Sequence, residues 1–138
     1  MRRGTRRAKP SGAKRSPTIL IVEDRRDQLE MYASYFAANH FTVLTAPDGL
    51  RAIQVAHAEL PDIIVTDLSM PHLDGWETAS RLKNDPETRH IPIIACSAHV
   101  LGRAAERALV AGCASYVCKP CLPQELHAEV LRVLARAA

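Results

Sequence analysis

The sequence predicts a single α/β domain, in which helices cover both faces of a five-stranded, all-parallel β-sheet. Short apolar runs rich in β-branched residues alternate five times with apolar stripes at helical spacing, and the connections between them are short. Such strand–helix repeats require parallel strands joined by right-handed crossovers, which is a doubly wound (βα)5 arrangement. The length of 138 residues fits one domain with one hydrophobic core.

The predicted strands are the apolar runs, and each run stops at polar or loop-forming residues. They cover residues 19–22, 41–46, 63–66, 91–95 and 115–118. Continuous apolar runs are typical of parallel strands that are buried on both faces. The run at 63–66 is the most informative, because it ends abruptly at Asp67 and a loop that contains proline and glycine.

The predicted helices follow the strands in turn. They cover residues 29–37, 50–59, 76–84, 104–109 and 123–134. In the first helix, apolar residues recur at i, i+3, i+4, i+7 and i+8 from Leu29, the pattern of a helix packed on a sheet. Gly112 is predicted to end the fourth helix, and Pro123 suits the first position of the last one.

Polar residues follow four of the five strands, at the point where each strand ends. They are Glu23 and Asp24 after the first strand, Asp67 after the third, Ser97 after the fourth and Lys119 after the fifth. The carboxyl ends of parallel strands share one edge of the sheet, where ligands bind in open α/β folds. We therefore expect these five side chains to meet at one site.

The charge of this predicted site indicates a bound cation. Three carboxylates and one ammonium leave a charge of about −2, and like charges about 4 Å apart repel by about 4 kcal/mol per pair at an effective dielectric constant near 20. Carboxylate oxygens without a Cys or His set match Mg²⁺, or Mn²⁺ in its place. With such an ion, Asp67 is suited to accept a phosphoryl group as a nucleophile. Lys119 would neutralise charge and Ser97 would donate a hydrogen bond to the attached group.

From residue 19 to the C-terminus, the chain resembles the receiver domains of the two-component response-regulator family. The segments ILIVED, PDIIVTDLSMPHLDGWE, IPIIACSA and YVCKP occur in the order and spacing of that family. The resemblance implies the flavodoxin-like strand order 2-1-3-4-5 and a function in phosphorelay signal transduction. It also implies that a sensor histidine kinase or a histidine phosphotransfer protein phosphorylates Asp67. The protein would be a phosphoacceptor with slow self-dephosphorylation rather than an enzyme.

The resemblance assigns a metal shell and a conserved lysine to particular residues. Asp24 would bind the metal directly, Glu23 mostly through water, and Ser69 through its backbone carbonyl, with Asp67 completing the protein ligands. Lys119 corresponds to the invariant lysine of the family.

The resemblance also implies a switch that responds to phosphorylation. Ser97 corresponds to the switch hydroxyl and Tyr116 to the switch aromatic. Phosphorylated Asp67 would pull the Ser97 hydroxyl inward and let Tyr116 turn. The face formed by the helix at 104–109, the strand at 115–118 and the last helix would then be reshaped for a downstream protein.

Three local features complete the predicted site. Ser69 and His99 occupy positions at which the family tunes the lifetime of the phosphoryl group, and the peptide bond before Pro120 is expected to be cis. Cys118 and Cys121 have the CxxC spacing of redox or metal motifs. We expect instead that Cys118 packs in the core as a small apolar residue and that Cys121 is incidental.

Other functions were weighed against the same residues. A haloacid-dehalogenase-type phosphatase needs a second acid two residues after its aspartate, where this chain has Ser69. A dinucleotide-binding fold needs a glycine-rich turn after the first strand, and residues 23–26 offer none. The remaining alternative is a phosphorylation-independent scaffold, a receiver-like binding module.

The N-terminal residues differ sharply in composition from the rest of the chain. Residues 1–17 carry seven basic and no acidic side chains, which leaves 11 basic against 15 acidic residues in the receiver segment, 18–138. The tail is expected to be disordered and to serve for solubility or as a linker. Weak contact with nucleic acid or an anionic surface is the alternative.

Composition also bears on location and on output. No apolar stretch has the length of a membrane span, and four cysteines without a signal segment fit a reduced, cytoplasmic location. Only 18 residues follow Pro120, enough for one helix. We therefore expect either a stand-alone regulator that acts by protein contact or a receiver cut from a longer protein.

Overall fold

The computed structural model describes residues 16–68, 70, 73–98, 107, 109 and 111–137. They form one five-stranded sheet in which all paired strands are parallel, in the order β2-β1-β3-β4-β5. The strands are β1 (Thr18–Val22), β2 (Thr42–Ala46), β3 (Ile63–Asp67), β4 (Ile93–Ser97) and β5 (Ser115–Cys118). The predicted fold class and strand order are confirmed.

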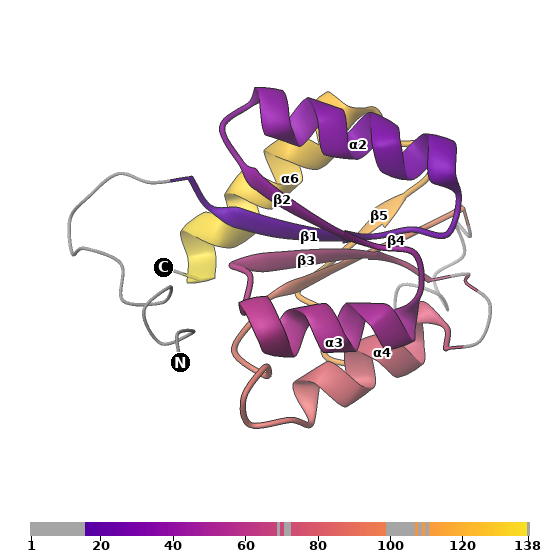
Figure 1. Ribbon diagram of the computed structural model, residues 1–138, viewed down its shortest axis with the longest axis vertical. Helices are drawn as coiled ribbons and strands as arrows, with labels where there is room; N and C mark the ends of the chain where they lie inside the picture. Colours follow the sequence, from indigo (N-terminus) through magenta and orange to yellow (C-terminus); the bar gives the residue numbers. More distant parts are fainter. Residues whose placement is uncertain are drawn as a thin grey trace.

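Helices cover both faces of this sheet (Figure 1). They are α2 (Arg26–Ala38) and α6 (Pro123–Ala137) on one face, and α3 (Gly49–Glu59) and α4 (Gly75–Lys83) on the other. Successive strand residues point to opposite faces, so Ile63 and Val65 pack beneath α2 and α6 while Ile64 packs beneath α3 and α4. Among the described helices, none combines the length and the apolar composition that a membrane crossing requires.

Side chains in the loops or in the first helical turn fix where three of these helices begin. Asp48 and Asp74 are the N-cap residues of α3 and α4, and each side chain accepts a hydrogen bond from a backbone N–H of the first helical turn, at 2.9 Å. At the start of α6, the Glu125 carboxylate accepts a hydrogen bond from Leu122 N at 2.9 Å. These caps set the direction in which each helix leaves the functional edge of the sheet.

The structure differs from the sequence prediction at β4. The strand was predicted at residues 91–95, but it begins after Pro92 and continues to Ser97. Cys96 pairs with Asp67, and Ser97 pairs with Cys118 of β5. The strand persists through polar residues because backbone groups, not side chains, form the ladder. The helix predicted at 104–109 and the basic tail fall almost entirely outside the described residues.

Backbone pairing continues one residue past several strands and holds the first loop residues in place. Glu23 N donates to Ala46 O at 3.1 Å, Leu68 N donates to Cys96 O at 3.0 Å, and Lys119 N donates to Ser97 O at 2.7 Å. Residues with functional side chains are therefore still attached to the sheet. Their positions follow from strand register rather than from loop conformation.

Candidate functional site

Three acids from two adjacent strands form a cluster at the carboxyl edge of the sheet. Glu23 and Asp24 follow β1, and Asp67 is the last residue of β3. One carboxylate oxygen from each lies within 4.8 Å of the others. Glu23 and Asp67 are only 3% and 7% exposed, whereas Asp24 is exposed to solvent. The sequence prediction that these acids meet agrees with this geometry.

Strand register explains why Glu23 and Asp67 face each other. Val22 of β1 pairs with Thr66 of β3, so Glu23 and Asp67, the next residue along each strand, lie side by side. Glu23 and Asp67 lie two residues after Ile21 and Val65, so all four side chains point to the same face of the sheet. Ile21 and Val65 pack toward α2 and α6. The two buried carboxylates therefore belong to the α2 side of the sheet.

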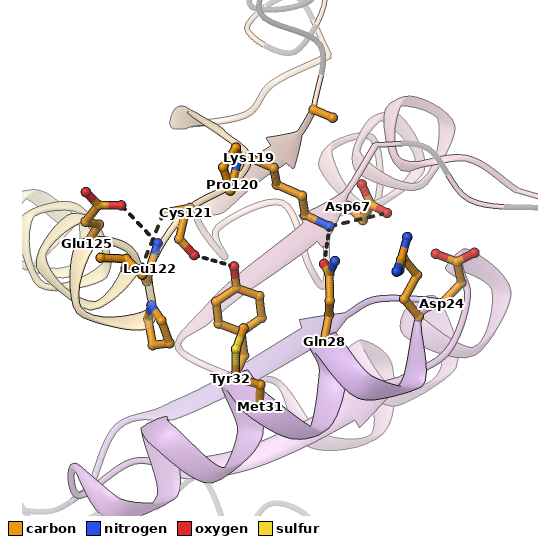
Figure 2. Close-up of a pocket in the computed structure, with 13 residues that line it drawn as sticks. Asp24, Gln28, Met31, Tyr32, Asp67, Lys119, Pro120, Cys121, Leu122 and Glu125 are labelled. Atoms are coloured by element: carbon orange, nitrogen blue, oxygen red, sulfur yellow. Dashed lines mark hydrogen bonds and ion pairs between the residues drawn. The ribbon is translucent and has the colours of Figure 1, made fainter.

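Lys119 enters the same site from the end of β5. Its Nζ donates to Glu23 Oε1 at 2.7 Å. It also donates to Gln28 Oε1 at 2.9 Å and lies 3.8 Å from Asp67 Oδ2 (Figure 2). Burial lowers the pKa of Lys119, but the hydrogen bond to Glu23 and the charge of Asp67 outweigh burial and hold the pKa above its ordinary value. The lysine is therefore a fixed positive charge in the site.

Both oxygens of Glu23 are held by the protein. Oε1 accepts from Lys119, and Oε2 accepts from the backbone N–H of Arg25 at 3.1 Å. Arg25 is the N-cap residue of α2, so this contact also attaches the start of that helix to the acid cluster. The two hydrogen bonds thus hold the Glu23 carboxylate in a single orientation.

The acid cluster has the chemistry of a divalent metal site. Two carboxylates within 4.8 Å of each other repel by at least about 3.5 kcal/mol at an effective dielectric constant near 20, and one ammonium cannot offset three of them. The donor atoms are hard carboxylate oxygens, which suit Mg²⁺. Asp24, which is exposed, could bind such an ion directly, and Glu23, with both oxygens engaged, could bind it through water.

A pocket of about 850 Å³ opens beside Asp67, between α2 and the loop that joins β5 to α6. Its walls include Gln28, Met31, Tyr32, Lys119 and Leu122 (Figure 2). Tyr32 donates to the backbone carbonyl of Cys121 at 2.7 Å, which ties the helix to the loop across the pocket. Sequence reasoning missed Gln28, because a neutral polar residue in a first helical turn carries no signal of its own.

Ser97 and Tyr116 lie on the opposite side of the sheet edge from Lys119. Ser97 is fully buried, and Tyr116 is half-buried against the core cluster that α3 and α4 cover. Burial and then the neighbouring Cys118 thiol raise the pKa of Tyr116, whereas hydrogen bonding to Ser97 lowers it. The two predicted switch residues are therefore in contact.

The cysteines do not occupy the positions that the sequence suggested. Cys118 was expected in the core and Cys121 was considered incidental, but Cys118 is exposed and Cys121 is buried at 8% exposure. The prediction for Cys118 was wrong because β5 is an edge strand and Cys118 is its last residue. The chain then turns back toward α2 at Cys121. Burial raises the pKa of a third thiol, Cys96, to about 12, so this neighbour of Asp67 stays protonated.

The remaining predicted site residues divide into two groups. The Lys119–Pro120 peptide bond is cis, the isomer that the resemblance implies. Ser69 and His99 lie outside the described residues, so the expected carbonyl ligand and the two tuning positions stay predictions.

Comparison with protein families gives one match that covers most of the chain. The family model for the response regulator receiver domain matches residues 19–131. The polar-differentiation response regulator DivK of Brucella anthropi is 33% identical over 103 residues, which are 75% of this chain and 84% of DivK. DivK of Brucella ovis matches over the same shares of the two chains.

Solved structures of response regulators and receiver domains are also similar to this chain. A putative response regulator from Chloroflexus aurantiacus superimposes with a TM-score of 0.83 at 31% identity, covering 88% of this chain and 99% of that one. The receiver domain of sensor histidine kinase PA1611 from Pseudomonas aeruginosa has a TM-score of 0.76 at 30% identity, covering 88% and 96% of the two chains. In that structure a magnesium ion is coordinated in the active-site cleft.

Proposed function

Because the chain belongs to the family of response regulator receiver domains, we propose that it accepts a phosphoryl group on Asp67 from a histidine kinase or a histidine phosphotransfer protein. Receiver domains are phosphoacceptors rather than classical enzymes. One observation carries the proposal for this chain. The Asp67 carboxylate ends β3 within 4.8 Å of two other acids and 3.8 Å from the Lys119 ammonium, beside an open pocket.

The reaction is a transfer between two side chains. An oxygen of Asp67 attacks the phosphorus of a phosphohistidine, the P–N bond breaks, and the imidazole nitrogen keeps the electron pair and takes up a proton. The product is an acyl phosphate on Asp67. Lys119 counters the negative charge of the transferring group, and its position in the site is fixed before the donor arrives.

The metal that the family binds fits the acids of this chain. Mg²⁺, when bound, would neutralise the phosphoryl oxygens and the acid cluster. We infer that Asp24 and Asp67 bind it directly and that Glu23 binds it through water, because both Glu23 oxygens already accept hydrogen bonds. Slow self-dephosphorylation would follow from attack of water on the same phosphorus.

The pocket beside Asp67 is the proposed docking site of the phosphodonor protein. A donor histidine must approach Asp67 through the opening between α2 and the loop after β5. Two large apolar side chains on its rim are exposed, Met31 at 44% and Leu122 at 61%. Exposed apolar residues next to a reaction centre are typical of a protein interface, and here they would pack against a helical face of the donor.

Ser97 and Tyr116 would report phosphorylation to the rest of the domain. The Ser97 hydroxyl would exchange its contact with Tyr116 for a hydrogen bond to the phosphoryl group on Asp67. Tyr116 would then move, and the face predicted for the helix at 104–109, β5 and α6 would change for a downstream protein. A shift from 1:99 to 99:1 requires about 5.5 kcal/mol of differential interaction, which several charge-assisted hydrogen bonds can supply.

The decisive experiment measures phosphoryl attachment directly. The protein is incubated with acetyl phosphate or phosphoramidate in the presence of Mg²⁺, and intact mass is recorded. Wild type should gain one phosphoryl group, and EDTA or the Asp67→Asn substitution should abolish the gain. Asp48→Asn is the matched control, because it removes an acid elsewhere and leaves a residue that also caps α3.

Two outcomes would overturn the proposal. The absence of any added mass with both donors would favour the phosphorylation-independent scaffold. Added mass that persists in Asp67→Asn would place the acceptor elsewhere. A pull-down that compares the phosphorylated and unphosphorylated protein then tests the switch, which predicts a partner retained by one form only.

A further inference from the structure

Lys119 divides its hydrogen bonds between two acceptors, and one of them has no part in the proposed reaction. Its Nζ donates to Glu23 Oε1 at 2.7 Å and to Gln28 Oε1 at 2.9 Å. The distance from Nζ to Asp67 Oδ2 is 3.8 Å, which is beyond a hydrogen bond. The ammonium therefore faces the phosphoacceptor without a direct hydrogen bond to it.

The position of Gln28 is well defined by its helix. Gln28 lies in the first turn of α2, which is anchored by the bond from Arg25 N to Glu23 Oε2 and by the bond from Leu29 N to Arg25 O at 2.9 Å. Its amide reaches into the pocket toward Lys119 (Figure 2). The amide is neutral, so Gln28 orients the ammonium without adding negative charge to a site that already holds three acids.

We propose that Gln28 is a positioning residue that keeps Lys119 apart from Asp67 in the resting site. This inference rests on the proposed function. An ammonium has three donors, and two of them are used by Glu23 and Gln28. The third is left for an oxygen of the incoming phosphoryl group.

The distances indicate what the loss of Gln28 would do. Without the amide oxygen, the released donor is free to turn toward Asp67 Oδ2, which lies 3.8 Å from Nζ, about 1 Å beyond hydrogen-bond distance. A direct hydrogen bond would engage an oxygen lone pair of Asp67, the same atom type that must attack phosphorus. Gln28 thus keeps the Lys119 ammonium from donating to Asp67 Oδ2 while holding it close enough to contact an incoming phosphoryl group.

The kinetic test uses a small donor, so that protein docking does not enter. Phosphoryl incorporation is measured against acetyl phosphate concentration, with saturating Mg²⁺, for wild type and Gln28→Met. Methionine keeps the length and helix propensity of glutamine but removes the acceptor. We expect Gln28→Met to lower the maximum rate about fivefold, corresponding to about 1 kcal/mol, with the half-saturating donor concentration unchanged.

Two comparisons separate positioning from a general structural effect. Glu30→Met places the same new side chain on the exposed part of α2 and should leave the rate unchanged. In a double-mutant cycle, Gln28→Met should have no further effect once Lys119→Met is present, because its action passes through that lysine.

A crystal structure of metal-free Gln28→Met supplies an independent readout. Lys119 Nζ should lie at about 3 Å from Asp67 Oδ2 in that variant. An unchanged rate in Gln28→Met, or an equal loss in the presence and absence of Lys119, would overturn the inference. If wild type accepts no phosphoryl group, the proposed function has failed, and the Nζ to Oδ2 distance in the variant still decides the role of Gln28.

Discussion

Replacing Asp67 with asparagine should stabilise the metal-free protein. At 7% exposure the carboxylate bears a desolvation penalty that amounts to several kcal/mol for a buried ion. Glu23 lies within 4.8 Å and repels Asp67 by at least about 3.5 kcal/mol, for an effective dielectric constant near 20. This repulsion offsets most of the attraction between Asp67 and Lys119, about 4.4 kcal/mol at 3.8 Å. Asp24 is exposed, so water screens its contribution.

The substitution removes the desolvation cost and leaves no stranded charge. Lys119 retains Glu23 and Gln28 as acceptors in the variant. We therefore expect Asp67→Asn to raise the free energy of unfolding by about 1–2 kcal/mol in EDTA. Saturating Mg²⁺ should stabilise wild type, by about 2.7 kcal/mol at a hundredfold excess over Kd, and stabilise the variant much less.

Urea denaturation followed by circular dichroism measures both effects. Wild type, Asp67→Asn and the control Asp48→Asn are unfolded in EDTA and in Mg²⁺. Their urea midpoints are compared provided that the dependence of the unfolding free energy on urea concentration is the same. The electrostatic reasoning fails if Asp67→Asn is less stable than wild type in EDTA. It also fails if Mg²⁺ shifts the midpoints of wild type and Asp67→Asn equally.

Three further predictions concern neighbours of the site. Gly75→Ala should lower the free energy of unfolding by about 1–3 kcal/mol and slow phosphorylation, because the new Cβ would lie 2.3 Å from the carbonyl oxygen of Asp67; urea denaturation and intact-mass kinetics measure the two effects. Tyr32→Phe should cost about 1–2 kcal/mol in urea, because the buried hydrogen bond to Cys121 O is lost. Burial raises the pKa of Cys96 from 9.0 to about 12, so the folded state keeps a proton that the unfolded chain releases. Stability should therefore fall as pH rises from 9 toward 12, and Cys96→Ala should reduce that slope in urea titrations across the range.

Each of these predictions has a clear contrary result. Wild-type stability in Gly75→Ala would mean that the start of α4 can move away from β3 without cost. An unchanged midpoint in Tyr32→Phe would show that the tie between α2 and the loop after β5 contributes nothing. An unchanged slope in Cys96→Ala would assign the alkaline loss of stability to other groups.

The fold and the acidic edge could be predicted because they depend on simple patterns. A run such as Ile63, Ile64 and Val65 can be buried only as a strand or helix interior, and its length and β-branched content favour a strand. Parallel topology then gathers the residues after each strand at one edge. Asp67 and Lys119 were therefore found together although 52 positions separate them in the sequence.

What the sequence did not reveal depends on backbone pairing and side-chain reach. Ser97 was read as a loop residue because it is polar, whereas the ladder with Cys118 keeps it in β4. The exposure of Cys118 and the burial of Cys121 follow from the edge position of β5, which the motif itself does not encode. Gln28 joins the site only because Lys119 is long enough to cross from β5 to α2.

The alternation of side chains along β1 and β3 limits where the protein can vary in length. Glu23 and Asp67 share one side of the sheet because β1 and β3 pair in a fixed register, with Val22 opposite Thr66. Inserting or deleting one residue inside either strand would rotate a carboxylate to the far side and dismantle the acidic edge. Length changes should therefore be confined to turns at the opposite end of the strands, such as residues 84–90, where added residues leave the carboxylates where they are.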